Sequence, residues 1–138
     1  MGDGLTWLRL PAEMSSLGAF TEFAHAGARA ASLPEAAVHK LDLMLEEVLV
    51  NVFRYAYPAG QAGEAEVGYA AAPPDGLRID VRDSGREFNP LEKEDPDLEL
   101  GLEERPIGGL GIFLVKTMAE SVSYRRENGR NILSFCLR

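Results

Sequence analysis

The stretch that decides the fold is Leu77-Arg78-Ile79-Asp80-Val81-Arg82-Asp83-Ser84-Gly85. Its odd positions are apolar up to Val81 and its even positions are charged up to Arg82, which is the period of a β-strand with one buried face. Asp83 ends the strand on the apolar parity, so its side chain is expected to point toward the buried layer. A carboxylate there must be hydrogen-bonded or reach a pocket. The segment therefore predicts a strand that ends at a site, with a turn-forming Asp as the alternative.

The residues before this strand predict a long helix over 34–55, which stops before Pro58. A core stripe recurs along it at helical spacing: Leu41, Leu45, Val48, Val52 and Tyr55. Glu47 and Asn51 lie one turn apart, so their side chains share a face beside that stripe. Asn is a poor residue inside a helix because its amide competes for backbone hydrogen bonds. The pair therefore suggests a ligand-binding face, whereas the alternative is an ordinary solvated surface.

A glycine run, Gly108-Gly109-Leu110-Gly111, precedes an apolar helix expected from Gly109 to about Glu120. Glycines let backbone N–H groups approach a phosphate, and a helix N-terminus favours negative charge. The run can also be only the entry to a helix. It is not a Walker loop, because no Gly-Lys-Ser/Thr follows, and it is not a Rossmann start, because a loop and not a strand precedes it.

The remaining elements predict a single α+β domain over residues 1–138, in the order β-α-α-β-β-loop-α-β-β. We expect one mixed sheet with the helices on one face. The first helix should begin at a Ser15 or Ser16 cap and the second at a capping box that starts at Ser32. The expected strands cover 5–10, 65–71, 77–82, 121–126 and 131–137, and Asn128-Gly129 predicts a hairpin turn between the last two.

Composition limits the classes of function. Apolar residues make up 46% and charged residues 26% of the 138, as in soluble globular proteins. The net charge of −8 argues against nucleic acid as a partner, because phosphate binding needs a basic face. No apolar run approaches the roughly 20 residues of a membrane span and no basic-then-apolar signal opens the chain, so we expect a cytoplasmic protein. The single cysteine, Cys136, is expected to be a packing residue.

Taken together, the three segments resemble the GHKL ATP-binding superfamily, which has the Bergerat fold. Within it, the resemblance is closest to the anti-sigma-factor serine/threonine kinases of bacterial partner-switching pathways. The pair Glu47–Asn51 matches the N box, Asp83-Ser84-Gly85 the adenine-contacting box and Gly109-Leu110-Gly111 the glycine box. Phe88-Asn89-Pro90 and the run over 105–112 add to the resemblance, which covers nearly the whole chain.

The resemblance implies a role for each matching residue. Glu47 would be the general base for a substrate hydroxyl, Asn51 a ligand of Mg²⁺, and Asp83 the acceptor for the adenine amino group of ATP. The residues from about 86 to 108 would be a lid over the nucleotide. The remaining nucleotide-binding residues would be Gly85, which leaves room for a flat group, Arg105, a phosphate contact, and the glycine-box residues Gly109, Leu110 and Gly111.

The implied function is an ATP- and Mg²⁺-dependent protein kinase. It would phosphorylate a serine or threonine of an antagonist protein of the STAS type and sequester a sigma factor, and the family suggests a homodimer. Neither nucleic acid nor a membrane is expected as a partner. One alternative is a regulator in which ATP only shapes a binding surface. Another is a detached histidine-kinase catalytic domain, which His25 does not support because it lies outside an acidic His motif.

Overall fold

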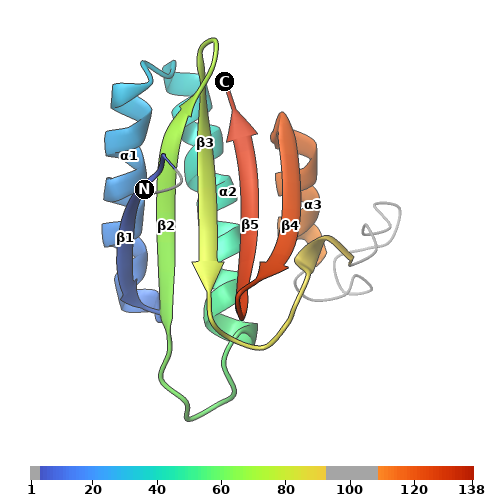
Figure 1. Ribbon diagram of the computed structural model, residues 1–138. Coiled ribbons are helices and arrows are strands. Elements are labelled where there is room, and N and C mark those ends of the chain that lie inside the picture. The colour runs from blue at the N-terminus through green and yellow to red at the C-terminus, as the bar shows by residue number, and fades with distance from the viewer. Residues whose placement is uncertain (1–3, 93–108) are drawn as a thin grey trace.

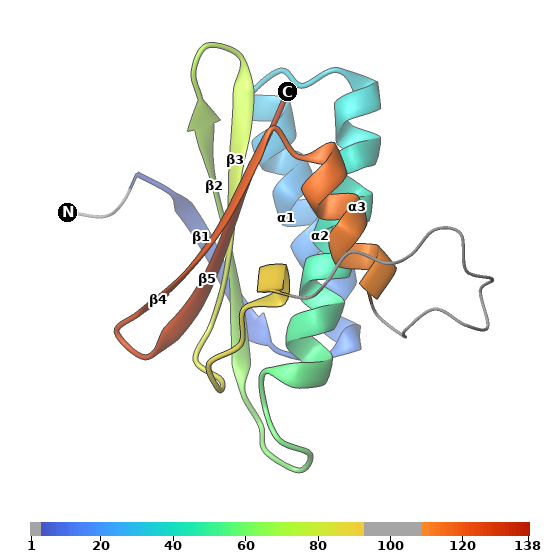
Figure 2. The ribbon, with the colours of Figure 1, turned by 90° about the vertical axis from the view of Figure 1, so that its right-hand side faces the viewer.

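The computed structural model describes residues 4–92 and 109–138. The predicted α+β fold is confirmed: in this part of the chain a five-stranded sheet carries all three α-helices on one face (Figures 1 and 2). The elements are β1 (Thr6–Pro11), α1 (Leu17–Ala30), α2 (Glu35–Tyr55), β2 (Glu64–Ala72), β3 (Gly76–Asp83), α3 (Gly109–Met118), β4 (Ser121–Glu127) and β5 (Arg130–Leu137), with short 3₁₀ turns at Met14–Ser16 and Pro90–Glu92.

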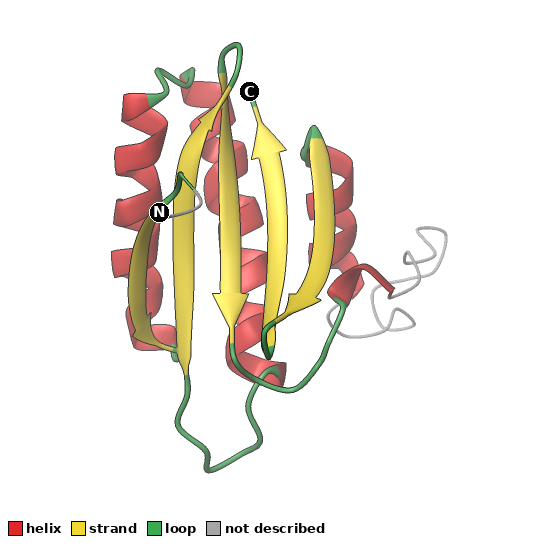
Figure 3. Ribbon diagram, in the orientation of Figure 1, coloured by secondary structure: helices red, strands yellow, loops and turns green. Residues whose placement is uncertain are grey.

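The sheet has the order β1-β2-β3-β5-β4, and each of these neighbouring pairs is antiparallel (Figure 3). The prediction of a mixed sheet is therefore wrong. The reason lies in the last hairpin, which places β5 between β3 and β4, so that these two strands, which run in the same direction, are not neighbours. The predicted turn of this hairpin is confirmed, since Asn128 and Gly129 have φ of 53° and 76°.

The link between α1 and α2 differs from the predicted capping box. Ser32 has a left-handed φ of 56°, and its N–H donates to the Arg29 carbonyl at 3.1 Å. Pro34 takes the N-cap position of α2, without a side-chain cap. Ser32 thus helps to end α1 and does not cap α2, because an N-cap residue has an extended backbone and Pro34 takes that position before Glu35.

The core lies between the sheet and the helices. The α2 residues Leu41, Leu45, Val48 and Leu49 are buried against apolar residues of α1 and of the central strands. This stripe fixes the rotation of α2 about its axis, and it directs the C-terminal half of the helix toward the end of β3. Among the described helices, none has the length and apolar character that crossing a membrane would require.

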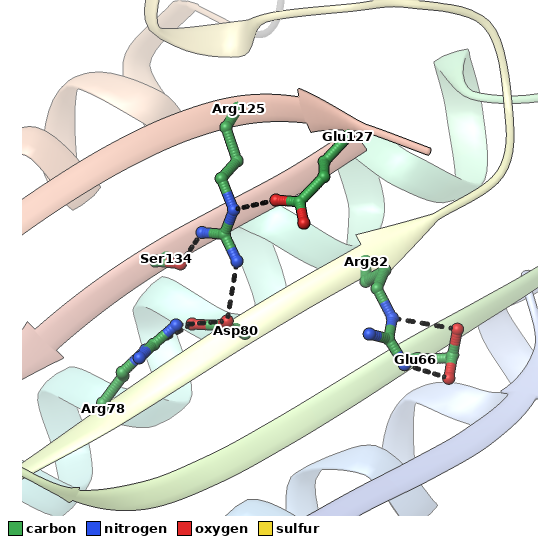
Figure 4. Close-up of polar contacts among 7 residues, drawn as sticks. All are labelled: Glu66, Arg78, Asp80, Arg82, Arg125, Glu127 and Ser134. Carbon is green, nitrogen blue, oxygen red and sulfur yellow. Dashed lines mark hydrogen bonds and ion pairs between the residues drawn. The ribbon is translucent and has the colours of Figure 1, made fainter. Parts of the chain in front are cut away.

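The other face of the sheet is polar, as the alternation along β3 predicts. Asp80, only 1% exposed, receives two hydrogen bonds from Arg78, at 2.9 and 2.8 Å (Figure 4). Arg82 forms a similar pair with Glu66 and stacks over the Trp7 ring. The even positions of β3 therefore belong to the polar face, and Asp83 is left on the face that the helices cover.

Candidate functional site

Asp83 lies at the end of β3, where α2 approaches the sheet, and is only 5% exposed. Its backbone pairs with Ala65 on one side and with Asn131 on the other. A pocket opens beside it, lined by Val48, Asn51, Val52, Ala56, Val81, Asp83, Phe88, Pro90, Tyr124, Asn131 and Leu133. The structure therefore brings two of the predicted site residues, Asp83 and Asn51, to one mostly apolar pocket.

The Asp83 carboxylate is both hydrogen-bonded and directed at the pocket. Its Oδ1 accepts the Gly85 N–H at 2.8 Å and the Asn131 side-chain amide at 3.0 Å. Burial raises the pKa of Asp83, and the hydrogen bonds from Asn131 and Gly85 and the charge of Arg126 oppose that rise. Within the described residues both hydrogen bonds reach Oδ1, so Oδ2 is the oxygen that remains for a ligand.

Asn51 is 7% exposed, and its side chain bonds within its own helix. Its Nδ2 donates to the Glu47 backbone carbonyl at 2.8 Å, which is the competition for backbone that the sequence indicated. This bond uses the amide nitrogen, and among the residues that the structure describes the Oδ1 atom has no hydrogen-bond partner, so it suits a ligand. An amide oxygen suits Mg²⁺, which takes few protein ligands and keeps waters. The described residues hold no cluster of three His, Cys, Asp or Glu side chains, so such an ion would rely on Asn51, water and a ligand's own oxygens.

Glu47 lies against the first turn of α3. A Cβ atom built on Gly111 would come within 2.0 Å of the Glu47 Oε2 atom, so the carboxylate rests on the glycine itself. Gly109 and Leu110 form the start of the same helix. The predicted base and the predicted glycine box are therefore neighbours. Arg105, and the part of the predicted lid over 93–108, lie outside the described residues.

Gly85 has a closer neighbour than the sequence suggested. A Cβ atom on Gly85 would lie 2.1 Å from the Ala56 carbonyl oxygen, which also accepts the Arg86 N–H at 2.9 Å. The space beside Gly85 is thus filled by the backbone at the end of α2. The glycine allows the end of β3 and the end of α2 to meet.

Sequence reasoning missed Asn131 and Tyr124 as site residues. Asn131 shares the parity of Leu133, Phe135 and Leu137 on β5, so an amide stands where the pattern calls for an apolar side chain. That is the same signal that marked Asp83 on β3, and it could have identified Asn131. Tyr124 gives no comparable signal, because a half-buried tyrosine is ordinary on an edge strand.

Known proteins are similar to this chain over most of its length. The family described as histidine kinase-like ATPase domain matches residues 10–137. The serine-protein kinase RsbW of Listeria innocua serovar 6a is 31% identical over 140 residues, which cover 96% of this chain and 86% of that protein. The RsbW of Oceanobacillus iheyensis is 26% identical over 101 residues, 70% of this chain and 63% of that protein.

A solved structure is also similar in fold. It is the histidine kinase domain of the blue-light activated histidine kinase EL346 from Erythrobacter litoralis, with a TM-score of 0.56 and 20% identity. The match covers 88% of this chain and 60% of that one. The chain belongs to the histidine kinase-like ATPase domain family. Its relatives within that family include proteins named serine-protein kinase RsbW, which confirms the resemblance to anti-sigma-factor kinases.

The two site glycines should respond differently to alanine. Gly85→Ala forces backbone against backbone at Ala56, so we expect a loss of about 1–3 kcal/mol in the free energy of unfolding. Gly111→Ala meets only the flexible end of Glu47 and adds a good helix former, so stability should fall little or rise. Urea unfolding of both variants measures this. Equal destabilisation would contradict the two kinds of contact.

Asp83→Asn should stabilise the folded chain at neutral pH. The raised pKa means that the folded state favours the protonated carboxyl, so stability falls as the pH rises from the ordinary value of 3.8 and the penalty is complete above the folded-state pKa. The asparagine avoids this cost and keeps an oxygen for Gly85 and Asn131. Below the ordinary value of 3.8 the aspartate is protonated in both states, and the difference should vanish. Urea unfolding across this range tests the sign, and a less stable variant at pH 7 would contradict it.

Proposed function

We propose that this chain is an ATP- and Mg²⁺-dependent protein serine/threonine kinase of the cytoplasm. Its substrate is an antagonist protein of the STAS type, and it also binds and sequesters a sigma factor. One observation carries the proposal: Asp83 and Asn51 face a single pocket, while Glu47, one helical turn from Asn51, rests on the first turn of α3. Similarity to relatives named serine-protein kinase supports the class of substrate.

Adenine recognition is assigned to Asp83. A carboxylate only accepts hydrogen bonds, so its free oxygen suits the exocyclic amino group of adenine. The neighbouring side chains Val48, Val52 and Leu133 supply apolar walls for a flat ring. This combination of apolar walls with one directed polar group is typical of a small-molecule site.

The phosphates are assigned to the region between Asn51 and the start of α3. The Asn51 amide oxygen would hold the metal ion, and the N–H groups of the glycine-rich turn would donate hydrogen bonds to phosphate oxygens. When bound, Mg²⁺ supplies positive charge that neutralises the phosphates during transfer. The chain itself contributes position, because α2 holds Asn51 and Glu47 at a fixed helical spacing.

Glu47 is assigned as the general base. Glu47 is half-buried, so we assign its open side to the approach of a protein hydroxyl. Accepting the proton of a serine or threonine hydroxyl would make that oxygen a better nucleophile. The contact with Gly111 keeps the carboxylate at the edge of the proposed phosphate region.

Three alanine variants on one helix separate these roles. Glu47→Ala should bind ATP·Mg²⁺ nearly as the parent does but lose phosphotransfer by roughly 10²–10⁴-fold, because the base acts only on the attacking hydroxyl. Asn51→Ala should lose metal-dependent nucleotide binding and transfer together. Glu46→Ala, at an exposed neighbouring position, is the matched control and should change neither.

The measurements are calorimetric binding of ATP·Mg²⁺ and transfer of labelled phosphate to purified candidate antagonist proteins. Parent-level transfer in Glu47→Ala would exclude it as the base. A parent protein that binds ATP but phosphorylates none of the antagonists would favour the non-catalytic regulator.

A further inference from the structure

The side chain of Asn131 is a buried hydrogen-bonding centre, with an exposed fraction of 5%. Its Nδ2 donates to Asp83 Oδ1 at 3.0 Å and to the Arg86 carbonyl at 2.7 Å. Its Oδ1 accepts from the Tyr124 hydroxyl at 2.6 Å, the Arg126 Nη1 at 3.1 Å and the Phe88 N–H at 3.2 Å. One amide thus connects the end of β3, the segment after it and the edge strand β4.

These partners leave Asn131 a single orientation. The two groups facing Nδ2 are a carboxylate and a carbonyl, which only accept, and the three groups facing Oδ1 all donate. Rotating the amide by 180° would set its N–H₂ against two groups that can only donate, Arg126 Nη1 and the Phe88 N–H, and its oxygen against two acceptors. The network therefore holds the amide in place, and through it one oxygen of Asp83.

The segment that Asn131 holds is also part of the pocket wall. Phe88 and Pro90 line the pocket beside Asp83, and the Phe88 ring packs on Tyr55 of α2 with centroids 5.8 Å apart. The bonds from Asn131 to Arg86 and Phe88 fix the backbone that carries these side chains. Arg126 adds a second link, because its Nη1 also donates to the Gly85 carbonyl at 2.8 Å.

We propose that Asn131 is a positioning residue that couples the Asp83 carboxylate to the segment 85–90. The selectivity for adenine over guanine and the backbone order of this segment then both depend on the Asn131 side chain. The inference rests on the proposed function, since it deepens the adenine role of Asp83. Adenine offers an amino group where guanine has a carbonyl. A carboxylate held by Asn131 presents its free oxygen in one direction and discriminates between the two, whereas a carboxylate that rotates discriminates less.

The first test needs no nucleotide. Asn131→Ala should raise the amide hydrogen-exchange rates of Gly85 and Phe88 by tenfold or more. The Phe88 N–H loses its acceptor, the Asn131 oxygen, and the Asp83 oxygen that accepts from Gly85 loses its hydrogen bond from Asn131. Ser134→Ala, at a buried hydroxyl on the polar face of the same strand, is the matched control and should leave both rates unchanged. Rates in Asn131→Ala equal to those of the parent would overturn the coupling.

The second test measures the ratio of ATP to GTP affinity by calorimetry on the full chain. In Asn131→Ala this ratio should fall by roughly tenfold or more, whereas in Ser134→Ala it should match the parent. Equal losses of ATP and GTP affinity, with the ratio preserved, would reduce Asn131 to a structural role and overturn the proposal. If the parent binds neither nucleotide, the proposed function fails, and the exchange experiment alone decides whether the coupling exists.

Two milder variants keep the proposal testable if Asn131→Ala does not fold. Tyr124→Phe removes one donor from the Asn131 oxygen, and Arg126→Met removes another together with the link to the Gly85 carbonyl. Both should speed exchange at Phe88 and lower the ATP-to-GTP ratio, Arg126→Met more than Tyr124→Phe. The absence of any change in both variants would contradict the coupling.

Discussion

The burial of the Asp83 carboxylate is the constraint on which the rest of the site depends. Placing a carboxylate at the end of a central strand, on the helix-covered face, removes it from water and raises its pKa. The Gly85 N–H and the Asn131 amide offset part of that cost. Other features follow from this pair of bonds, because Gly85 must also pass close to Ala56, and Asn131 must satisfy its own oxygen from Phe88, Tyr124 and Arg126.

The second constraint is the apolar stripe of α2. Burial of Val48 and Leu49 sets the angle of the helix, so that Asn51 faces the pocket and Glu47 faces the first turn of α3. The end of β3, the C-terminal half of α2 and the first turn of α3 are far apart in the sequence, and this packing brings them together. The same packing that stabilises the domain also holds the proposed metal ligand and base one helical turn apart.

Much of this arrangement could be predicted from local patterns. The alternation along β3 gave the face of Asp83, and helical spacing gave the long helix that carries Glu47 and Asn51. The order of the strands could not be predicted in the same way, because local patterns do not show which strands are neighbours. β3 and β4 run in the same direction, but β5 lies between them, so they do not form a parallel pair. Ser32 was assigned to the wrong helix, because a capping pattern does not show that this residue takes a left-handed φ and bonds back to the end of α1. Asn131 carried a readable parity signal, but its role depends on five partners that only the folded chain brings together.

Calorimetric titration of ATP·Mg²⁺ into the parent and into Asp83→Asn tests the central claim most directly. The parent should bind, and the variant should lose about 1.5–3 kcal/mol of binding free energy, since a charge-assisted acceptor is replaced by an amide. Asp80→Asn, on the same strand but on the polar face, should bind as the parent does. Equal affinity of the parent and Asp83→Asn for ATP would contradict the claim that this buried carboxylate recognises the nucleotide.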